Sequence, residues 1–142
     1  AVALLAHGRV PLAHSARCFT ARRYNLQKDA CEFRCLAHPD GLTLRTREGQ
    51  PFLTVNGVQT QSAATYTLLA ELPALAAAGV GVVRVSPQAE GTLDLVALHR
   101  AAIDGTIDAA AAAAQLPALL AGPACNGFWH ARPGAEFVAA PA

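Results

Sequence analysis

Three of the four cysteines lie close together, within residues 15–35 (SARCFTARRYNLQKDACEFRC). Cys18, Cys31 and Cys35 have the spacing Cys-x12-Cys-x3-Cys, and Cys125 follows after 89 intervening residues. Cysteine thiolates bind zinc and iron–sulfur clusters, and two nearby thiols can form a disulfide. The clustering therefore predicts that residues 15–35 are a cysteine-rich metal-binding segment.

Each alternative to an iron–sulfur cluster explains part of this pattern. Zinc sites use cysteine pairs that are separated by two to four other residues, so Cys31 and Cys35 qualify as one pair. His14 or His38 would have to complete the zinc site. A disulfide requires an oxidising compartment, for which the sequence gives no sign. Free cysteines that only pack in a core explain Cys125 well but three clustered cysteines poorly.

The same segment is basic. Its two acidic residues are Asp29 and Glu32, and its five basic residues are Arg17, Arg22, Arg23, Lys28 and Arg34. The segment therefore has a net charge of +3, whereas the whole chain has a net charge of +1. A [4Fe-4S] core held by four thiolates carries a charge of about −2, which nearby arginines stabilise. The alternative explanation is a charged face that only contacts solvent.

The composition is that of a globular protein. The chain has 142 residues, 53% of them hydrophobic, and a mean hydropathy of +0.28, which suffices for one core. Because the sequence lacks methionine and opens on an apolar run, we expect residues 1–142 to be a single incomplete domain, a piece of a longer protein. We expect a cytoplasmic protein with no secretory signal and no transmembrane segment, because no apolar run approaches about 20 residues. The weak net charge does not indicate a nucleic-acid partner.

The order of short apolar runs and amphipathic stretches predicts an α/β fold. Buried parallel strands are expected at residues 2–6 and 80–85, and a hairpin is expected across residues 42–57. Helices are expected at residues 16–24 with Ser15 as cap, around 29–35, from 62 to Gly79, at 92–104 and at 107–120. If Cys31 and Cys35 lie on one helix, they share a face.

Other polar residues are weaker candidates for a site. His7 and Arg9 follow the first expected strand, where barrel enzymes collect site residues, so both are candidate pocket residues, although capping or packing also explains them. Peptidase motifs are missing from the sequence: it has neither a His-Glu-x-x-His helix nor a Gly-x-Ser-x-Gly elbow. Ser15 beside His14 is better explained as a helix cap.

Longer stretches carry a family resemblance. They are HGRVPLAHSARCFTARRYNLQKDACEFRC, LRTREGQPFLTVNGVQTQS and CNGFWH, and together with the cysteine spacing they extend over nearly the whole chain. In these stretches the chain resembles the UbiV family, ubiquinone-biosynthesis proteins of the collagenase-like peptidase superfamily. The resemblance implies the C-terminal portion of a TIM-barrel-like α/β fold with an inserted β-hairpin.

The resemblance also implies a function. It implies a [4Fe-4S] cluster bound by Cys18, Cys31 and Cys35, with a fourth ligand outside this chain and Cys125 as an uncertain substitute. It further implies a heterodimer with a UbiU-like paralogue that supports anaerobic, oxygen-independent ring hydroxylation of a ubiquinone precursor on its lipid carrier, with prephenate as oxygen donor. Catalytic residues are not identified, and a collagenase-like peptidase and a zinc-stabilised interaction scaffold stay open as alternatives.

Overall fold

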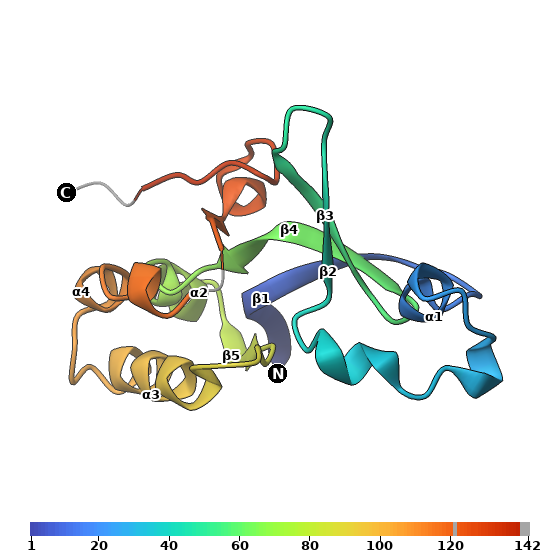
Figure 1. Ribbon diagram of the computed structural model, residues 1–142. Coiled ribbons are helices and arrows are strands. Elements are labelled where there is room, and N and C mark those ends of the chain that lie inside the picture. The colour runs from blue at the N-terminus through green and yellow to red at the C-terminus, as the bar shows by residue number, and fades with distance from the viewer. Residues whose placement is uncertain (121, 140–142) are drawn as a thin grey trace. The chain divides into compact units, whose positions relative to one another are not determined.

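The structure, a computed structural model, describes residues 1–120 and 122–139 (Figure 1). It is a mixed α/β fold. Its strands are β1 (Val2–His14), β2 (Leu42–Arg45), β3 (Pro51–Asn56), β4 (Gln59–Thr67), β5 (Val80–Val85) and β6 (Ala124–Cys125). Within the described residues they form one six-stranded sheet in the order β2-β3-β4-β1-β5, and β6 pairs with β4.

The chain divides into two compact units. Unit 1 comprises Ala1–Gly8 and Thr65–Ala142, and unit 2 comprises Arg9–Ala64. Strands β1 and β4 contribute residues to both units. The three clustered cysteines belong to unit 2, whereas Cys125 belongs to unit 1.

Unit 1 contains the parallel pairing that the apolar runs predict. β1 pairs in parallel with β5, from Val2 opposite Val80 to His7 opposite Val85. β6 pairs in parallel with the end of β4. The positions predicted for β1 and β5 are confirmed, but β1 runs on to His14, and β5 is less buried than predicted, since Val82 is half exposed.

The core of unit 1 is built from leucines. Its helices are α2 (Leu72–Ala77), α3 (Thr92–Ile103) and α4 (Ala109–Ala113), and α3 lies beside α4 (Figure 1). The buried cluster comprises Leu68, Leu69, Leu72, Leu75, Leu95, Ala112 and Leu116. In the part of the chain that the structure describes, every helix is too short or too polar to cross a membrane.

Two helices of unit 1 differ from the sequence prediction. The helix expected from residue 62 is wrong in its first part, because β4 occupies Gln59–Thr67 and only α2 is helical. The alanine-rich helix expected at residues 107–120 is shorter. It is capped by the Asp108 carboxylate and gives way to the 3-10 turn η3 (Leu116–Ala118), where Pro117 cannot donate a helical hydrogen bond.

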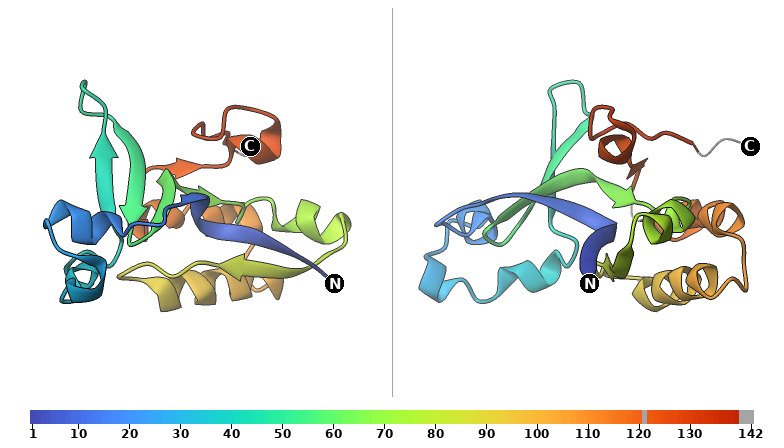
Figure 2. Two further views of the ribbon diagram at one scale, coloured as in Figure 1. Left: turned by 90° about the vertical axis from the view of Figure 1, so that its right-hand side faces the viewer. Right: turned by 180° about the vertical axis from the view of Figure 1, so that it is seen from behind.

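Unit 2 has a hairpin and a run of short helical turns. β2 pairs antiparallel with β3, and β3 pairs antiparallel with β4. Figure 2 shows β2 and β3 side by side, joined by a turn at one end. The hairpin predicted across residues 42–57 is therefore present as an antiparallel pair. The helical elements are α1 (Phe19–Arg23) and the 3-10 turns η1 (Lys28–Ala30) and η2 (Arg34–Ala37).

Unit 2 has very little core. Among its described residues, four side chains are buried: Thr20, Ala21, Thr54 and Val55. Two of these four are threonines, so little apolar surface is removed from water. Unit 1 is stabilised by its leucine cluster, whereas unit 2 has no comparable cluster among its described residues.

Gly8 is predicted to be hard to replace, because it combines a positive φ with a close neighbour. Its φ is +127°, and an added Cβ would lie 2.4 Å from the Ser86 Cβ. We expect Gly8→Ala to lower the free energy of unfolding by about 2–4 kcal/mol, because the strain of a positive φ and the steric overlap with Ser86 both contribute. Urea unfolding of the full chain measures this loss.

The matched control is Gly105→Ala. Gly105 also has a positive φ of +71°, but an added Cβ would meet nothing within 4 Å. In this variant only the strain of a left-handed backbone applies, so the free energy of unfolding should fall by about 1 kcal/mol. Equal losses in the two variants would contradict the steric explanation.

Candidate metal centre

Cys18 starts the helical part of unit 2. It is the N-cap of α1, and its Sγ accepts a hydrogen bond from the Ala21 backbone N–H at 3.4 Å. The prediction that Ser15 caps a helix from residue 16 is wrong. The Ser15 Oγ accepts from the Arg17 N–H at 3.1 Å, and the Ser15 N–H donates to the Val58 carbonyl at 2.8 Å. The chain is thus tied to the turn after β3, and the helix begins later.

Cys31 and Cys35 are not on one helix, contrary to the sequence prediction. Cys31 ends η1, and Cys35 lies in η2. Between them, Glu32 and Phe33 have φ values of 53° and 50°, in the left-handed region. A right-handed helix cannot include two such residues. Cys31 and Cys35 therefore do not share a helical face.

Aromatic and charged contacts join α1 to η2. The Tyr24 hydroxyl lies 2.7 Å from His38 Nε2, and their rings stack with centroids 5.9 Å apart. The Arg34 guanidinium lies 5.8 Å from the Tyr24 ring centroid and 2.7 Å from the Glu32 carboxylate. These contacts hold the loop that carries Cys35. They also engage Nε2 of His38, one of the two histidines considered for zinc.

The cysteines fit a metal site in their chemistry but not in their arrangement. Cys18, Cys31 and Cys35 are free thiols, each partly exposed. Across residues 1–120 and 122–139, no three Cys, His, Asp or Glu side chains are grouped so that they could hold a metal ion. The structure therefore does not bring the three predicted ligands together.

Cys125 differs from the other three thiols. It lies in β6 of unit 1, where it is buried, and burial raises the pKa of its thiol. A raised pKa disfavours the thiolate, the form that binds metals. This environment agrees with a packing role, the explanation that the sequence favours for this cysteine.

A basic hollow adjoins Cys18. Its volume is about 510 Å³, and Arg17 and Arg22 are among its lining residues. Both arginines are exposed along with the neighbouring Arg23. Two arginines at one hollow favour the binding of an anion there.

His7, predicted as a pocket residue, is fully buried in unit 1. Neither of its ring nitrogens has a hydrogen-bond partner, and the His99 ring packs against it edge-on with centroids 5.5 Å apart. Burial, and next the charge of His99, lower the pKa of His7 from 6.5 to about 4. The imidazole is therefore neutral at pH 7.

Arg9, the other predicted pocket residue, is bound within unit 2. Its Nη1 lies 2.7 Å from Thr54 Oγ1 and 3.1 Å and 2.5 Å from the carbonyl oxygens of Ser62 and Ala63. One guanidinium thus links β1, β3 and β4, which compensates in part for the small core. Pocket roles for His7 and Arg9 stay predictions.

Unit 1 contains a polar cluster that the sequence analysis did not single out. Glu71 follows β4 and Asn126 follows β6, and their side chains are joined by a hydrogen bond of 3.0 Å from Asn126 Nδ2 to Glu71 Oε1. His130 Nε2 also lies 3.0 Å from Glu71 Oε1. The position of these residues in the sequence could have indicated the cluster, because polar residues just after paired parallel strands gather at one edge of a sheet.

No protein-family profile matches the chain. No solved structure matches it.

We predict that acid destabilises unit 1 through His7. The folded pKa, about 4, lies below the ordinary 6.5, so the unfolded chain binds more protons between these values. The contribution of His7 to the free energy of unfolding is fully present above about pH 6.5. It falls, by up to about 3 kcal/mol, as the pH decreases toward 4. His99 acts in the same direction, because burial lowers its pKa too.

His7→Gln should reduce this loss, measured as the difference in urea unfolding between pH 7 and pH 4.5. His14→Gln is the control, because His14 is exposed and its replacement should leave the difference unchanged. If His7→Gln loses as much stability in acid as the unmodified chain, His7 is not the titrating group.

Proposed function

We propose that this chain is an iron–sulfur protein in which Cys18, Cys31 and Cys35 bind a [4Fe-4S] cluster, with the fourth ligand from outside the chain. We also propose that it acts in oxygen-independent ring hydroxylation in ubiquinone biosynthesis. One observation carries the metal-binding part of the proposal: the unit that contains these three cysteines has almost no hydrophobic core.

The missing core is most evident around the cysteines. From Arg22 to Leu53, none of the described side chains is buried. Small units of this kind are ordinarily held by disulfides or by a bound metal, whose binding energy then contributes to folding. All three thiols here are free. A metal held by these thiols would supply the stabilisation that packing does not.

The segment between the ligands also suits a site that closes around a metal. Glu32 and Phe33 hold strained left-handed conformations between Cys31 and Cys35, and such strain is common where a loop clamps a ligand. Binding requires the thiols to approach one another more closely than they do here. The intervening elements are short turns without buried described side chains, so little packing opposes that movement.

Charge favours an anionic cluster at this position. A [4Fe-4S] core with four thiolates carries a charge of about −2. Arg17 and Arg22 line the hollow next to Cys18. Zinc bound by the same cysteines would satisfy the packing argument equally well, and the resemblance to the UbiV family is what favours iron.

Exposed apolar side chains support a protein partner. Phe33 is 72% exposed and Leu36 is 80% exposed, and both lie within two residues of Cys35. Large apolar side chains left in water beside a functional segment mark interaction surfaces. We propose that a UbiU-like paralogue covers them in a heterodimer.

The rest of the biological role comes from the family resemblance. It comprises a ubiquinone precursor on its lipid carrier as substrate and prephenate as oxygen donor. We also propose that the sheet is the C-terminal part of a TIM-barrel-like fold with β2 and β3 as an inserted hairpin. The parallel pairs β1–β5 and β4–β6 support this part of the proposal.

We predict that anaerobic reconstitution of the chain with iron and sulfide gives a brown protein with broad visible absorption. Cys18→Ser, Cys31→Ser and Cys35→Ser should each lose most of the bound iron and acid-labile sulfide, because each removes one thiolate ligand. Visible absorbance and analysis for iron, sulfide and zinc are the measurements.

Cys125→Ser is the matched control and should keep the cluster, because Cys125 is a buried thiol of the other unit. A colourless product that contains zinc would support the scaffold alternative instead. Full cluster absorbance in all three motif variants, or an intact chain that takes up no iron, would refute the proposal.

A further inference from the structure

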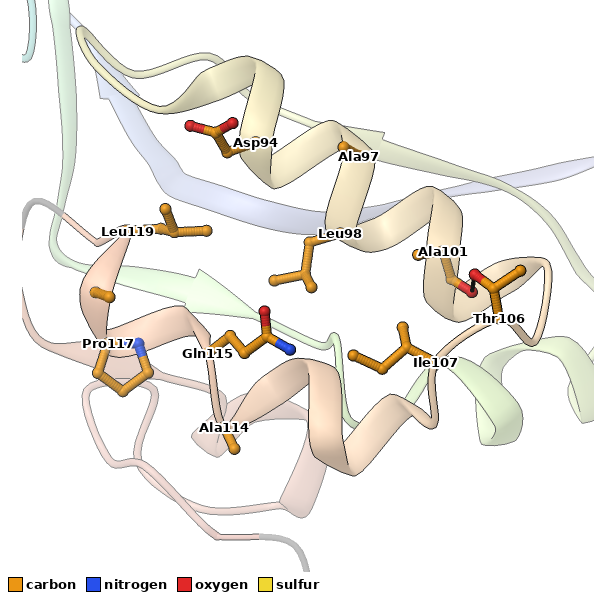
Figure 3. Close-up of a pocket in the computed structure, with 11 residues that line it drawn as sticks. Asp94, Ala97, Leu98, Ala101, Thr106, Ile107, Ala114, Gln115, Pro117 and Leu119 are labelled. Atoms are coloured by element: carbon orange, nitrogen blue, oxygen red, sulfur yellow. Dashed lines mark hydrogen bonds between the residues drawn. The ribbon is translucent and has the colours of Figure 1, made fainter.

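Unit 1 has an apolar groove that the proposed function does not use. It lies between α3 and the chain after α4, and its volume is about 840 Å³ (Figure 3). Leu98, Ile107 and Leu119 point into it. Most of the other lining residues are small and apolar: Ala97, Ala101, Ala114, Pro117 and Ala118. The groove therefore offers apolar walls with room for the larger side chains of another molecule.

The wall that α3 contributes is one face of the helix. Asp94, Ala97, Leu98 and Ala101 line the groove, and their spacing of i, i+3, i+4 and i+7 places them on the same side of α3. This face extends over about two helical turns, roughly 11 Å. A groove that runs along a helix between apolar walls is the usual seat of a docked amphipathic helix.

The surface of α3 carries more apolar side chains than its packing in unit 1 uses. Leu95 and His99 are its buried residues. Leu93 is 83% exposed, and Val96 and Ile103 are each nearly half exposed. Apolar residues on several sides of a helix are typical of a helix that is covered on more than one side. We therefore expect a protein partner rather than solvent against this part of unit 1.

The charge around the groove selects the kind of partner. Residues 86–122 contain four acidic residues and one basic residue, Arg100, which forms an ion pair with Asp104. Asp94 is exposed and lines the groove itself. Unit 1 as a whole has six acidic and three basic residues, a net charge of −3, although the whole chain has a net charge of +1. Charge complementarity therefore favours a basic partner.

We propose that this groove binds a basic amphipathic helix of a protein partner. Its apolar face packs against Leu98, Ile107 and Leu119, and its lysine or arginine side chains lie toward Asp94. The same charges disfavour other occupants, because two copies that met groove to groove would bring like charges together and an anionic membrane would be repelled. The proposal does not depend on a bound metal, since the three proposed thiol ligands belong to unit 2.

The test is fluorescence anisotropy of the full chain with a labelled peptide of about 14 residues, or four helical turns, that has leucines on one face and lysines on the other. We expect one-to-one binding that weakens several-fold when the salt concentration is raised, because exposed charges are screened. A peptide of the same composition in shuffled order, which has no apolar face, should bind at least about 10-fold more weakly. No binding of the amphipathic peptide, or equal binding of both peptides, would overturn the proposal.

Three variants locate the site. Ala97→Lys puts a positive charge and bulk into the groove at an exposed helical position, so peptide binding should weaken at least about 10-fold. Asp94→Asn should weaken it only a few-fold, because exposed ion pairs are weak. The matched control is Ala76→Lys, at an exposed position of α2 that does not line the groove, and it should bind as the unmodified chain does. Unchanged affinity in both groove variants, or an equal loss in Ala76→Lys and Ala97→Lys, would overturn the assignment.

Sedimentation of the chain without peptide tests the competing occupant, a second copy of the chain. The proposal predicts that Ala97→Lys leaves the oligomeric state unchanged. A dimer of the unmodified chain that Ala97→Lys dissociates would place a second copy in the groove and would overturn the proposal.

Discussion

The constraint that governs this protein is the small number of buried side chains in unit 2. From Arg9 to Ala64 only four described side chains are buried, so the hydrophobic effect contributes little to this unit. The antiparallel strands and the Arg9 hydrogen bonds hold one part of it. The start of the cysteine segment is held by the buried Thr20 and Ala21 and by backbone hydrogen bonds to the turn after β3. Its later part has the Tyr24, His38 and Arg34 contacts, which are exposed and individually weak. A metal bound by the thiols would be the strongest interaction in the unit.

Unit 1 shows the opposite balance. Its leucine cluster suffices as a core, and this stability allows polar groups to be buried at a cost. His7 and Thr67 are buried without partners for their side-chain polar atoms. Buried polar groups without hydrogen bonds are tolerated where packing compensates for their cost. Such groups are often found where a protein binds a ligand or responds to pH. The leucine cluster of unit 1 can therefore compensate for unsatisfied polar groups, whereas the few buried side chains of unit 2 cannot.

The sequence predicted what depends on local pattern. The strands at residues 2–6 and 80–85 and the hairpin across 42–57 were found, because apolar runs and alternation report burial directly. β4 was missed because its residues, QTQSAATYT, include alanines and a short apolar continuation that also fit a helix. The conformations of Glu32 and Phe33 could not be predicted, because neither residue type favours a left-handed backbone. The polar cluster around Glu71 depends on pairing between distant strands.

The most direct test of the central claim is amide hydrogen exchange of anaerobically prepared protein, before and after a chelator removes its metal. If thiol-bound iron replaces the missing core, metal removal should strongly reduce protection within residues 15–37, while the leucine core of unit 1 keeps its protection. Equal protection of residues 15–37 in the loaded and the stripped protein would contradict the claim.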